Sequence, residues 1–159
     1  MYKRIISLLI AGFVCVAAFA QTNGKTTIAP FKITLVNGKT YTYKELAKDK
    51  PTILVYFSPT CDHCKVFTEA MLKRQKELAG KQIVMVSYLP VSEVKKFDDE
   101  MHLSSNSNIK VGTEGYTFIV QKYYNVQRFP FVVEYDKSGK LSKVVPYNSQ
   151  KPDEMAAQL

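Results

Sequence analysis

The chain has 159 residues, with 22 Lys and Arg against 14 Asp and Glu. That length is enough for one domain with a single hydrophobic core, and it leaves no room for a large multidomain enzyme. Basic residues such as Lys73, Arg74 and Lys76 lie between acidic ones such as Glu69 and Glu77. This mixed pattern is typical of a solvated surface, so we do not expect nucleic-acid binding.

Residues 1–20 have the pattern of a secretory signal peptide. Lys3 and Arg4 precede an apolar stretch, and Ala18-Phe19-Ala20 offers a cleavage site with small residues at both required positions. The stretch is short for a membrane span, which needs about 20 residues, although an uncleaved anchor is an alternative. We therefore predict a periplasmic or secreted protein without stable membrane insertion after cleavage. Loss of two basic residues would leave 20 against 14 acidic ones, a net charge of about +6.

Residues 21–30 are polar, which predicts a flexible lead-in to a domain at 31–159. In this domain, Phe31, Ile33 and Leu35 alternate with other residues, as expected for a half-buried strand. Asn37-Gly38 predicts a hairpin turn. The spacing of Thr42 and Glu45 then matches a capping box that opens a short helix ending near Lys48.

Strands and helices alternate after Pro51. The run 52–58 is continuously apolar, which indicates a strand buried on both faces. Residues 103–116 are rich in Ser, Asn and Gly and predict a surface loop. The other predicted strands are 82–88, 131–135 and 141–145, and the predicted helices are one from Cys61 to Gly80, one capped by Ser92, one at 117–125 with Phe118 and Ile119 inward, and one starting near Pro152. This order predicts an α/β domain with a mixed β-sheet flanked by helices on both faces.

Cys61-Asp62-His63-Cys64 lies between the apolar strand and a predicted helix. A thiol at a helix N-terminus faces unpaired backbone N–H groups and the positive end of the helix dipole, which favour the nucleophilic thiolate. A second thiol one turn further on can resolve a mixed disulfide formed by the first. The third cysteine, Cys15, lies in the predicted signal peptide, so the mature protein has one closely spaced pair and no disulfide framework.

Two structural alternatives exist for this pair. A structural zinc ion needs four ligands, and only His63 and His102 could be added to the two thiols. A purely structural disulfide between Cys61 and Cys64 would close a very small loop and stabilise the fold little. Both alternatives explain the pattern less well than reversible thiol–disulfide exchange.

The segment from Val55 to Cys64 resembles the active-site segment of thioredoxin-fold proteins. The segment from Tyr123 to Lys140 resembles the family's tyrosine–valine–proline–strand–hairpin stretch. The hairpin at 31–46 is similar to the N-terminal extension of the TlpA/ResA-like branch. The resemblance implies a thioredoxin-like fold and an exported thiol–disulfide oxidoreductase without a cofactor. Its partners would be protein thiols or disulfides and a redox partner protein, and we expect a monomer. The resemblance also implies that Pro130 is cis and that Phe129 and Pro130 shape the partner groove.

The chain departs from this family pattern at three positions. Thr60 stands where the family often has Trp, Val55 where thioredoxins have a buried carboxylate, and Phe67 where the ResA-like branch often has Glu. The usual proton acceptor for the buried thiol is therefore missing from the sequence. Water, a backbone group or a spatial neighbour such as Glu69 would have to replace it.

The two residues between the cysteines act in opposite directions on the Cys61 thiolate. His63, which resembles the His of DsbA-like oxidases, would stabilise it, whereas an ionised Asp62 would repel it. Both side chains are expected to be exposed, so screening weakens both effects. The sequence leaves the direction of the redox reaction open.

Two other functions are consistent with this sequence. A peroxiredoxin-type thiol peroxidase shares the fold, but such enzymes have Thr three positions before their Cys, where this chain has Ser58. A non-enzymatic module could use the thiolates to hold a soft metal such as Cu(I) or to bind a partner. We predict that no metal is bound and that Cys61 and Cys64 are catalytic.

Overall fold

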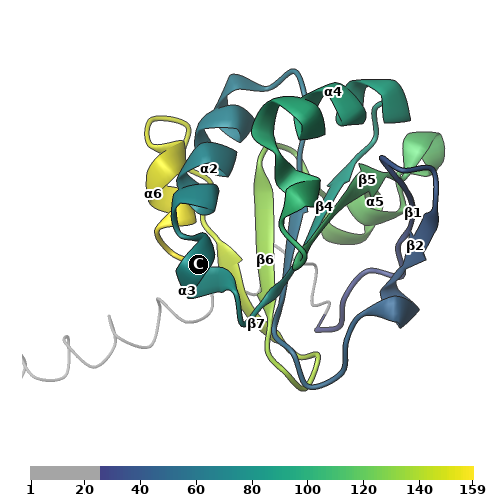
Figure 1. Ribbon diagram of the computed structural model, residues 1–159. Helices are drawn as coiled ribbons and strands as arrows, with labels where there is room; N and C mark the ends of the chain where they lie inside the picture. The colour runs from purple at the N-terminus through teal and green to yellow at the C-terminus, as the bar shows by residue number, and fades with distance from the viewer. Residues whose placement is uncertain (1–25) are drawn as a thin grey trace, which may run out of the picture.

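The computed structural model describes residues 26–159, so the predicted signal peptide and residues 21–25 lie outside the described residues. A seven-stranded sheet in the order β2-β1-β5-β4-β3-β6-β7 forms the centre of the domain (Figure 1). Strand β3 runs parallel to β4, and β4 to β5, whereas all other neighbours are antiparallel. The strands are β1 (Lys32–Leu35), β2 (Thr40–Thr42), β3 (Thr52–Tyr56), β4 (Gln82–Ser87), β5 (Ile109–Thr113), β6 (Phe131–Tyr135) and β7 (Leu141–Val145).

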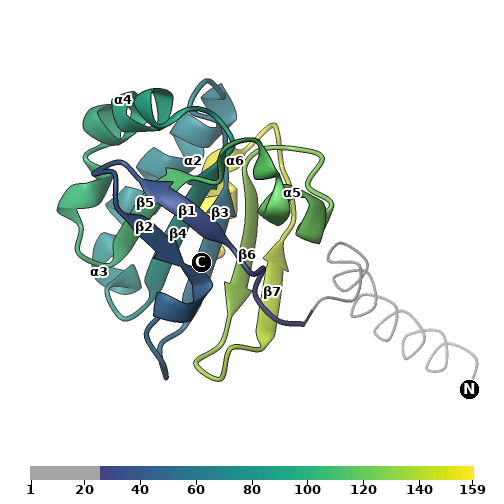
Figure 2. The ribbon, with the colours of Figure 1, turned by 90° about the vertical axis from the view of Figure 1, so that its right-hand side faces the viewer.

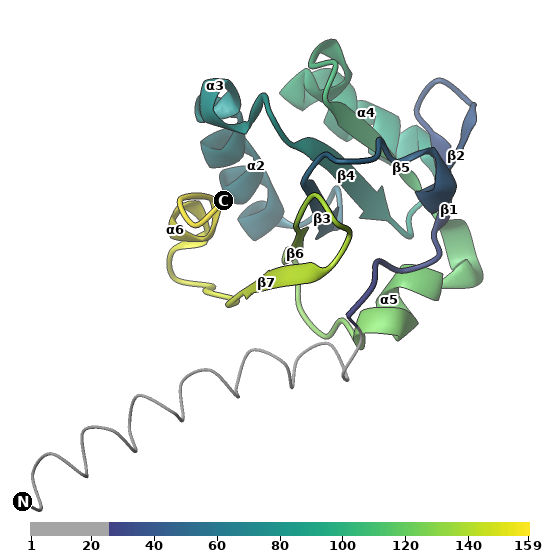
Figure 3. The ribbon, with the colours of Figure 1, turned by 90° about the horizontal axis from the view of Figure 1, so that it is seen from below.

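Helices cover both faces of this sheet, as predicted. Helices α2, α4 and α6 lie on one face and α5 lies on the other (Figure 3). Among residues 26–159, no helix is both long and apolar enough to span a bilayer. The helices are α2 (Asp62–Lys73), α3 (Gln75–Leu78), α4 (Val91–Met101), α5 (Ile119–Tyr124) and α6 (Pro152–Ala156), with short 3-10 turns η2 (Tyr43–Glu45), η3 (Leu103–Ser105) and η4 (Gly115–Thr117).

Strand β3 is buried on both faces, as its continuous apolar sequence predicts. Ile53 and Val55 point into the core layer shared with α2, α4 and α6. Leu54 and Tyr56 point into the opposite layer, which contains α5 and the residues before β1. Successive side chains of a strand alternate between faces, so one strand supplies both core layers.

The residues before β1 pack against the domain from Thr26 onward, although we predicted a flexible lead-in at 21–30. The N–H of Leu141 donates to the Thr26 carbonyl at 2.9 Å, and the N–H of Ala29 donates to the Tyr124 hydroxyl at 2.9 Å. Ala29 is completely buried. The segment passes β7 and β6 on its way to β1 (Figure 2). These two hydrogen bonds and the burial of Ala29 attach it to the domain.

The prediction of a surface loop at 103–116 was wrong, because this segment contains the buried strand β5. This strand pairs with β4 on one side and with β1 on the other. A side chain at Gly112 would place its Cβ 2.5 Å from the Thr34 carbonyl oxygen, so β1 can approach only a glycine here. Ile109 and Val111 are buried at the same time. The glycine that suggested a loop is required by this close contact between strands.

Four helix predictions also needed correction. The helix predicted from Cys61 to Gly80 is interrupted at Arg74, whose backbone leaves the helical region and separates α2 from α3. Ser92 does not cap α4, which begins one residue earlier, after Pro90. Ile119 is 37% exposed and not inward, and α5 begins at this residue, directly after the left-handed residue Phe118. The capping box at Thr42 and Glu45 forms, but it opens only the short turn η2.

A buried carboxylate joins β3 to α5. Glu114 accepts hydrogen bonds from the Tyr56 hydroxyl at 2.7 Å and from the Val120 N–H at 2.7 Å. The Gln121 N–H adds a longer bond of 3.4 Å. Burial, and then the hydrogen bond to Glu114, raise the pKa of Tyr56, so its hydroxyl remains a donor. Glu114 thereby satisfies orphan N–H groups at the start of a short helix.

We predict that Glu114→Ala lowers the free energy of unfolding by about 2–3 kcal/mol, because it leaves the Tyr56 hydroxyl and the Val120 N–H buried without their acceptor. Urea denaturation of the variant and the wild type measures this change. Glu100→Ala serves as the control, because Glu100 pairs with Lys65 on the surface, and its cost should stay within about 0.5 kcal/mol. Equal effects of the two substitutions would contradict the role of Glu114.

Candidate redox site

Cys61 is the N-cap residue of α2, in the extended conformation that a cap requires. The N–H of Cys64 points to its sulfur at 3.3 Å and to its carbonyl oxygen at 3.0 Å. The side chain of Cys61 is partly exposed. The sulfur therefore has access to solvent and receives a backbone donor at a helix N-terminus, where negative charge is favourable.

Cys64 lies one helical turn inside and is completely buried. Its side chain belongs to the core layer under α2, together with Phe67 and Met71. Burial raises the pKa of the Cys64 thiol, and the hydrogen bond with Cys61 raises it further, while a backbone hydrogen bond from Ser58 acts in the opposite direction. Both cysteines are free thiols in this structure, and they differ sharply in access to solvent.

The Phe129–Pro130 peptide bond is cis, as predicted. The carbonyl oxygen of Phe129 lies 3.7 Å from the Cys61 sulfur and accepts from its thiol. Tyr56 and Tyr88 pack against the Phe129 ring, with ring centroids 5.8 and 5.9 Å away. The two segments that the sequence singled out, 68 positions apart, therefore meet at one sulfur atom.

Asp62 is exposed and His63 is partly buried. The His63 Nδ1 atom lies 3.4 Å from the Tyr147 hydroxyl, and the two rings meet edge to face. The guanidinium of Arg128 lies 5.6 Å from the centre of the same Tyr147 ring. Sequence reasoning missed Tyr147 and Arg128, because only the fold brings the segment after β7 beside α2. Arg128 could have been noticed, since it directly precedes Phe129 and Pro130.

A proton acceptor for the buried thiol is not provided by Glu69, whose side chain is exposed and whose charge acts on Lys65 instead. Phe67, at the position where a Glu was considered, is completely buried in the core. The groups that act on the Cys64 thiol in the described part of the chain are Cys61 and the backbone of Ser58. The groups that act on the Cys64 thiol in residues 26–159 therefore include no carboxylate.

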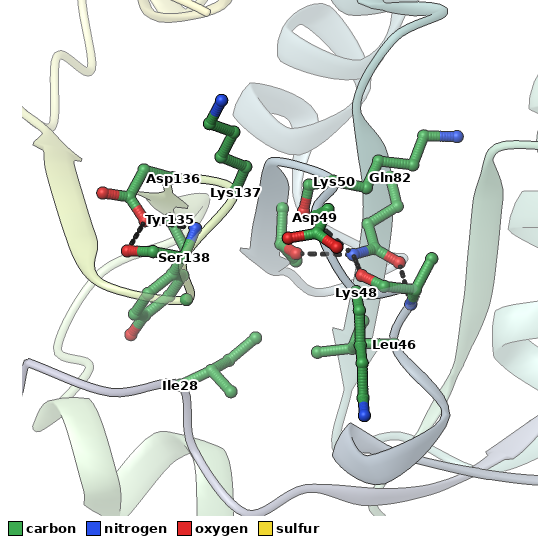
Figure 4. Close-up of a pocket in the computed structure, with 13 residues that line it drawn as sticks. Ile28, Leu46, Lys48, Asp49, Lys50, Gln82, Tyr135, Asp136, Lys137 and Ser138 are labelled. Atoms are coloured by element: carbon green, nitrogen blue, oxygen red, sulfur yellow. Dashed lines mark hydrogen bonds between the residues drawn. The ribbon is translucent and has the colours of Figure 1, made fainter.

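A pocket of about 360 Å³ lies at the other end of β3. Thr52, Gln82 and Tyr135 contribute to its wall. Thr52, at the start of β3, pairs with both Gln82 and Tyr135, whereas Cys61 follows the end of this strand. Its lysines extend in different directions and do not converge on one point (Figure 4). Gln82 is fully engaged in hydrogen bonds to the loop at 47–52. The pocket lining includes no cysteine or histidine, so the redox site lies elsewhere.

Comparison with known proteins supports this fold. No family model matches the sequence, and no curated protein matches it either. Among solved structures, a secreted disulfide oxidoreductase from Mycobacterium tuberculosis, homologous to E. coli DsbE, is similar with a TM-score of 0.65, 18% identity, and coverage of 82% of this chain and 96% of that one. A thiol:disulfide interchange protein of Chlorobium tepidum has a TM-score of 0.60, 23% identity, and coverage of 84% and 96%.

The peroxidoxin BcpB of Mycobacterium tuberculosis is also similar, with a TM-score of 0.65, 17% identity, and coverage of 85% of this chain and 97% of that one. The three structures share the fold of this chain, and because all three sequence identities are low, the similarities establish the fold alone. The chain has the thioredoxin fold, with a mixed sheet, helices on both faces and an N-terminal hairpin, as predicted. In residues 26–159 no group of three or more Cys, His, Asp and Glu side chains is placed to hold a metal ion.

We predict that iodoacetamide modifies Cys61 at least about tenfold faster than Cys64 in the native reduced protein at neutral pH, because Cys61 is accessible and Cys64 is buried and held protonated. Peptide mapping by mass spectrometry after short labelling times measures both rates. Labelling in urea, where both thiols are exposed, is the control. Faster native labelling of Cys64 would reverse the two roles.

The buried thiol also predicts a pH dependence of stability in the reduced protein. The Cys64 pKa is raised in the folded state, whereas an unfolded Cys ionises near about 8.5. As pH rises, Cys64 therefore loses its proton in the unfolded state before it does so in the folded state. This ionisation stabilises the unfolded state, so the free energy of unfolding decreases above about pH 8.5. We predict that the free energy of unfolding falls with pH between about pH 9 and 10.5 in the wild type. This decrease should be steeper than in Cys64→Ala by about 1 kcal/mol per pH unit.

Urea denaturation with a phosphine reductant at several pH values gives these slopes. The difference in slope is diagnostic, because the cavity made by Cys64→Ala changes the stability by the same amount at every pH. Parallel lines for the two proteins would show that Cys64 ionises equally easily in the folded and unfolded states.

Proposed function

We propose that this protein is an extracytoplasmic thiol–disulfide oxidoreductase that exchanges disulfides with partner proteins. The observation that carries the proposal is the pairing of an accessible Cys61 at the N-cap of α2 with a buried Cys64 one turn inside. Solved structures that share the fold include a secreted disulfide oxidoreductase and a thiol:disulfide interchange protein. Cys61 and Cys64 are the proposed catalytic residues.

The proposed reaction starts with attack of the Cys61 thiolate on a disulfide of the partner. The partner's S–S bond breaks, a mixed disulfide with Cys61 forms, and one partner thiolate leaves and takes up a proton. Cys64 then gives up its proton and attacks the Cys61 sulfur, which releases the second partner thiol. The partner gains two electrons, and the protein is left with a Cys61–Cys64 disulfide. Reaction with a dithiol runs through the same steps in reverse.

The residues around the cysteines have supporting roles in this proposal. The Phe129 carbonyl and Pro130 shape the place where the partner's sulfur approaches Cys61. His63 stabilises the Cys61 thiolate, and its ring is held by Tyr147. Asp62 opposes His63 through its negative charge, weakened by solvent.

The location and partners follow from the same proposal. Residues 1–20 would direct export, and a cleaved mature chain would act outside the cytoplasm, where disulfides persist. Its substrates would be protein thiols or disulfides, and a second redox protein would restore the active form. We propose that the mature protein acts as a monomer.

A thiol peroxidase is the second candidate, because the peroxidoxin BcpB shares the fold. Peroxide reduction needs donors that polarise both oxygens around the thiolate. Ser58 is buried and its hydroxyl bonds to Thr60. Arg128 lies over Tyr147, and in the described part of the chain no hydrogen bond joins it to Cys61. Disulfide exchange is therefore the better supported function.

We predict that the reduced protein reduces insulin disulfides, or that the oxidised protein oxidises a reduced substrate protein, whichever its potential favours. Cys61→Ser should abolish this exchange, whereas Cys64→Ser should accumulate a mixed disulfide at Cys61, because the resolving thiol is absent. A turbidity assay, non-reducing electrophoresis and a glutathione redox titration measure these outcomes. The titration also determines the direction of the reaction.

Stopped-flow measurement of hydrogen peroxide consumption on the same preparation separates the two candidates. We expect a rate no faster than that of an ordinary accessible thiolate. Rapid peroxide turnover without measurable exchange would contradict the proposed function and favour the peroxidase.

A further inference from the structure

We propose that Arg128, held over the ring of Tyr147, forms a subsite that selects partner segments with an acidic side chain next to the reacting cysteine. The proposal rests on the proposed function and adds a specificity to the same site. Arg128 directly precedes Phe129, and the carbonyl oxygen of Phe129 contacts the Cys61 sulfur.

The charge of Arg128 is not compensated within the described domain. Six ion pairs are present among residues 26–159, and none of them includes Arg128. In that part of the chain its guanidinium contacts the Tyr147 ring, at 5.6 Å from the ring centre. The side chain is exposed. All five N–H donors of the guanidinium therefore remain available to a carboxylate from outside.

Tyr147 places this charge. A cation over an aromatic face is attracted by the ring, so the guanidinium is held near one position in an otherwise flexible side chain. The Tyr147 hydroxyl in turn lies 3.4 Å from His63 Nδ1, and His63 belongs to the first turn of α2 directly after Cys61. Arg128, Tyr147 and His63 form a continuous row beside the cysteine pair.

A pocket of about 300 Å³ lies beside Arg128 and Tyr147. Its lining includes Arg128, Pro130 and Tyr147, together with Gln127. The Gln127 amide already donates to Asn125, which leaves Arg128 as the charged group of the lining. The pocket thus extends from the cis proline, which follows the residue that contacts Cys61, and offers one positive charge to a side chain that enters it.

No acidic side chain among residues 26–159 forms an ion pair with Arg128. Asp62 is the only acidic residue between the two cysteines, and its field acts on Lys65. Lys65 is also paired with Glu100 at 2.9 Å. An acidic residue of the partner is therefore the group that complements Arg128 in charge and hydrogen-bonding geometry.

Symmetric disulfide dimers of a short peptide with one cysteine provide the test. Two versions carry either Glu or Gln at both positions that flank the cysteine. All proteins carry Cys64→Ser, so that only the first step is observed, in which Cys61 forms a mixed disulfide and one peptide thiol is released. Acid quenching and chromatography at low salt give the rate for each peptide.

We expect the protein with Arg128 to react about threefold faster with the Glu peptide than with the Gln peptide, a size typical of an exposed ion pair. Arg128→Gln should remove this preference, and Arg128→Lys should keep part of it. High salt should weaken it, because the subsite is open to solvent. Lys44→Gln is the matched control, since Lys44 is an exposed cation over the Tyr43 ring at the β2 edge, and it should leave the preference intact.

Equal rates with both peptides, or a preference that survives Arg128→Gln, would overturn the subsite while leaving disulfide exchange in place. Failure to form a mixed disulfide with either peptide would instead contradict the proposed function itself. The two failures are therefore distinguishable in one experiment.

Discussion

Strand β3 lies in the middle of the sheet with no face open to water, so each of its side chains needs apolar partners in one of two separate layers. Ile53 and Val55 face the layer of α2, α4 and α6, and Leu54 and Tyr56 face the layer of α5. The chain leaves this buried core at the carboxyl end of β3. Cys61 begins α2 at that edge, where open α/β sheets commonly place their sites.

The pairing of β6 with β3 completes the site. These strands are antiparallel, and Tyr56 at the end of β3 pairs with Phe131 at the start of β6. The residues just before β6 must therefore lie beside those just after β3. The contact between the Phe129 carbonyl and the Cys61 sulfur is a consequence of this register. Glu114 supports the same corner from the other face, since it bonds Tyr56, which packs on Phe129.

A single helical turn then separates the two thiols into different environments. Cys61 keeps access to solvent and to a partner, whereas Cys64 joins the core and stays protonated through burial. This difference suits one thiol for attack and the other for resolution. Arg128 and Tyr147 extend the site to one side, where charge rather than thiol chemistry would distinguish among partners.

The sequence by itself determined the continuously apolar β3, the hairpin turn at Asn37-Gly38, the Cys-x-x-Cys pair and, through resemblance, the cis bond at Pro130. These features follow from local patterns, in which hydrophobic period, turn chemistry and motif spacing agree. Only the tertiary structure decided that Gly112 lies in a buried strand, that Glu114 is a buried acceptor, and that Tyr147 stands between His63 and Arg128. Each of these depends on a partner that is distant in the chain, and neither period nor propensity encodes such a contact.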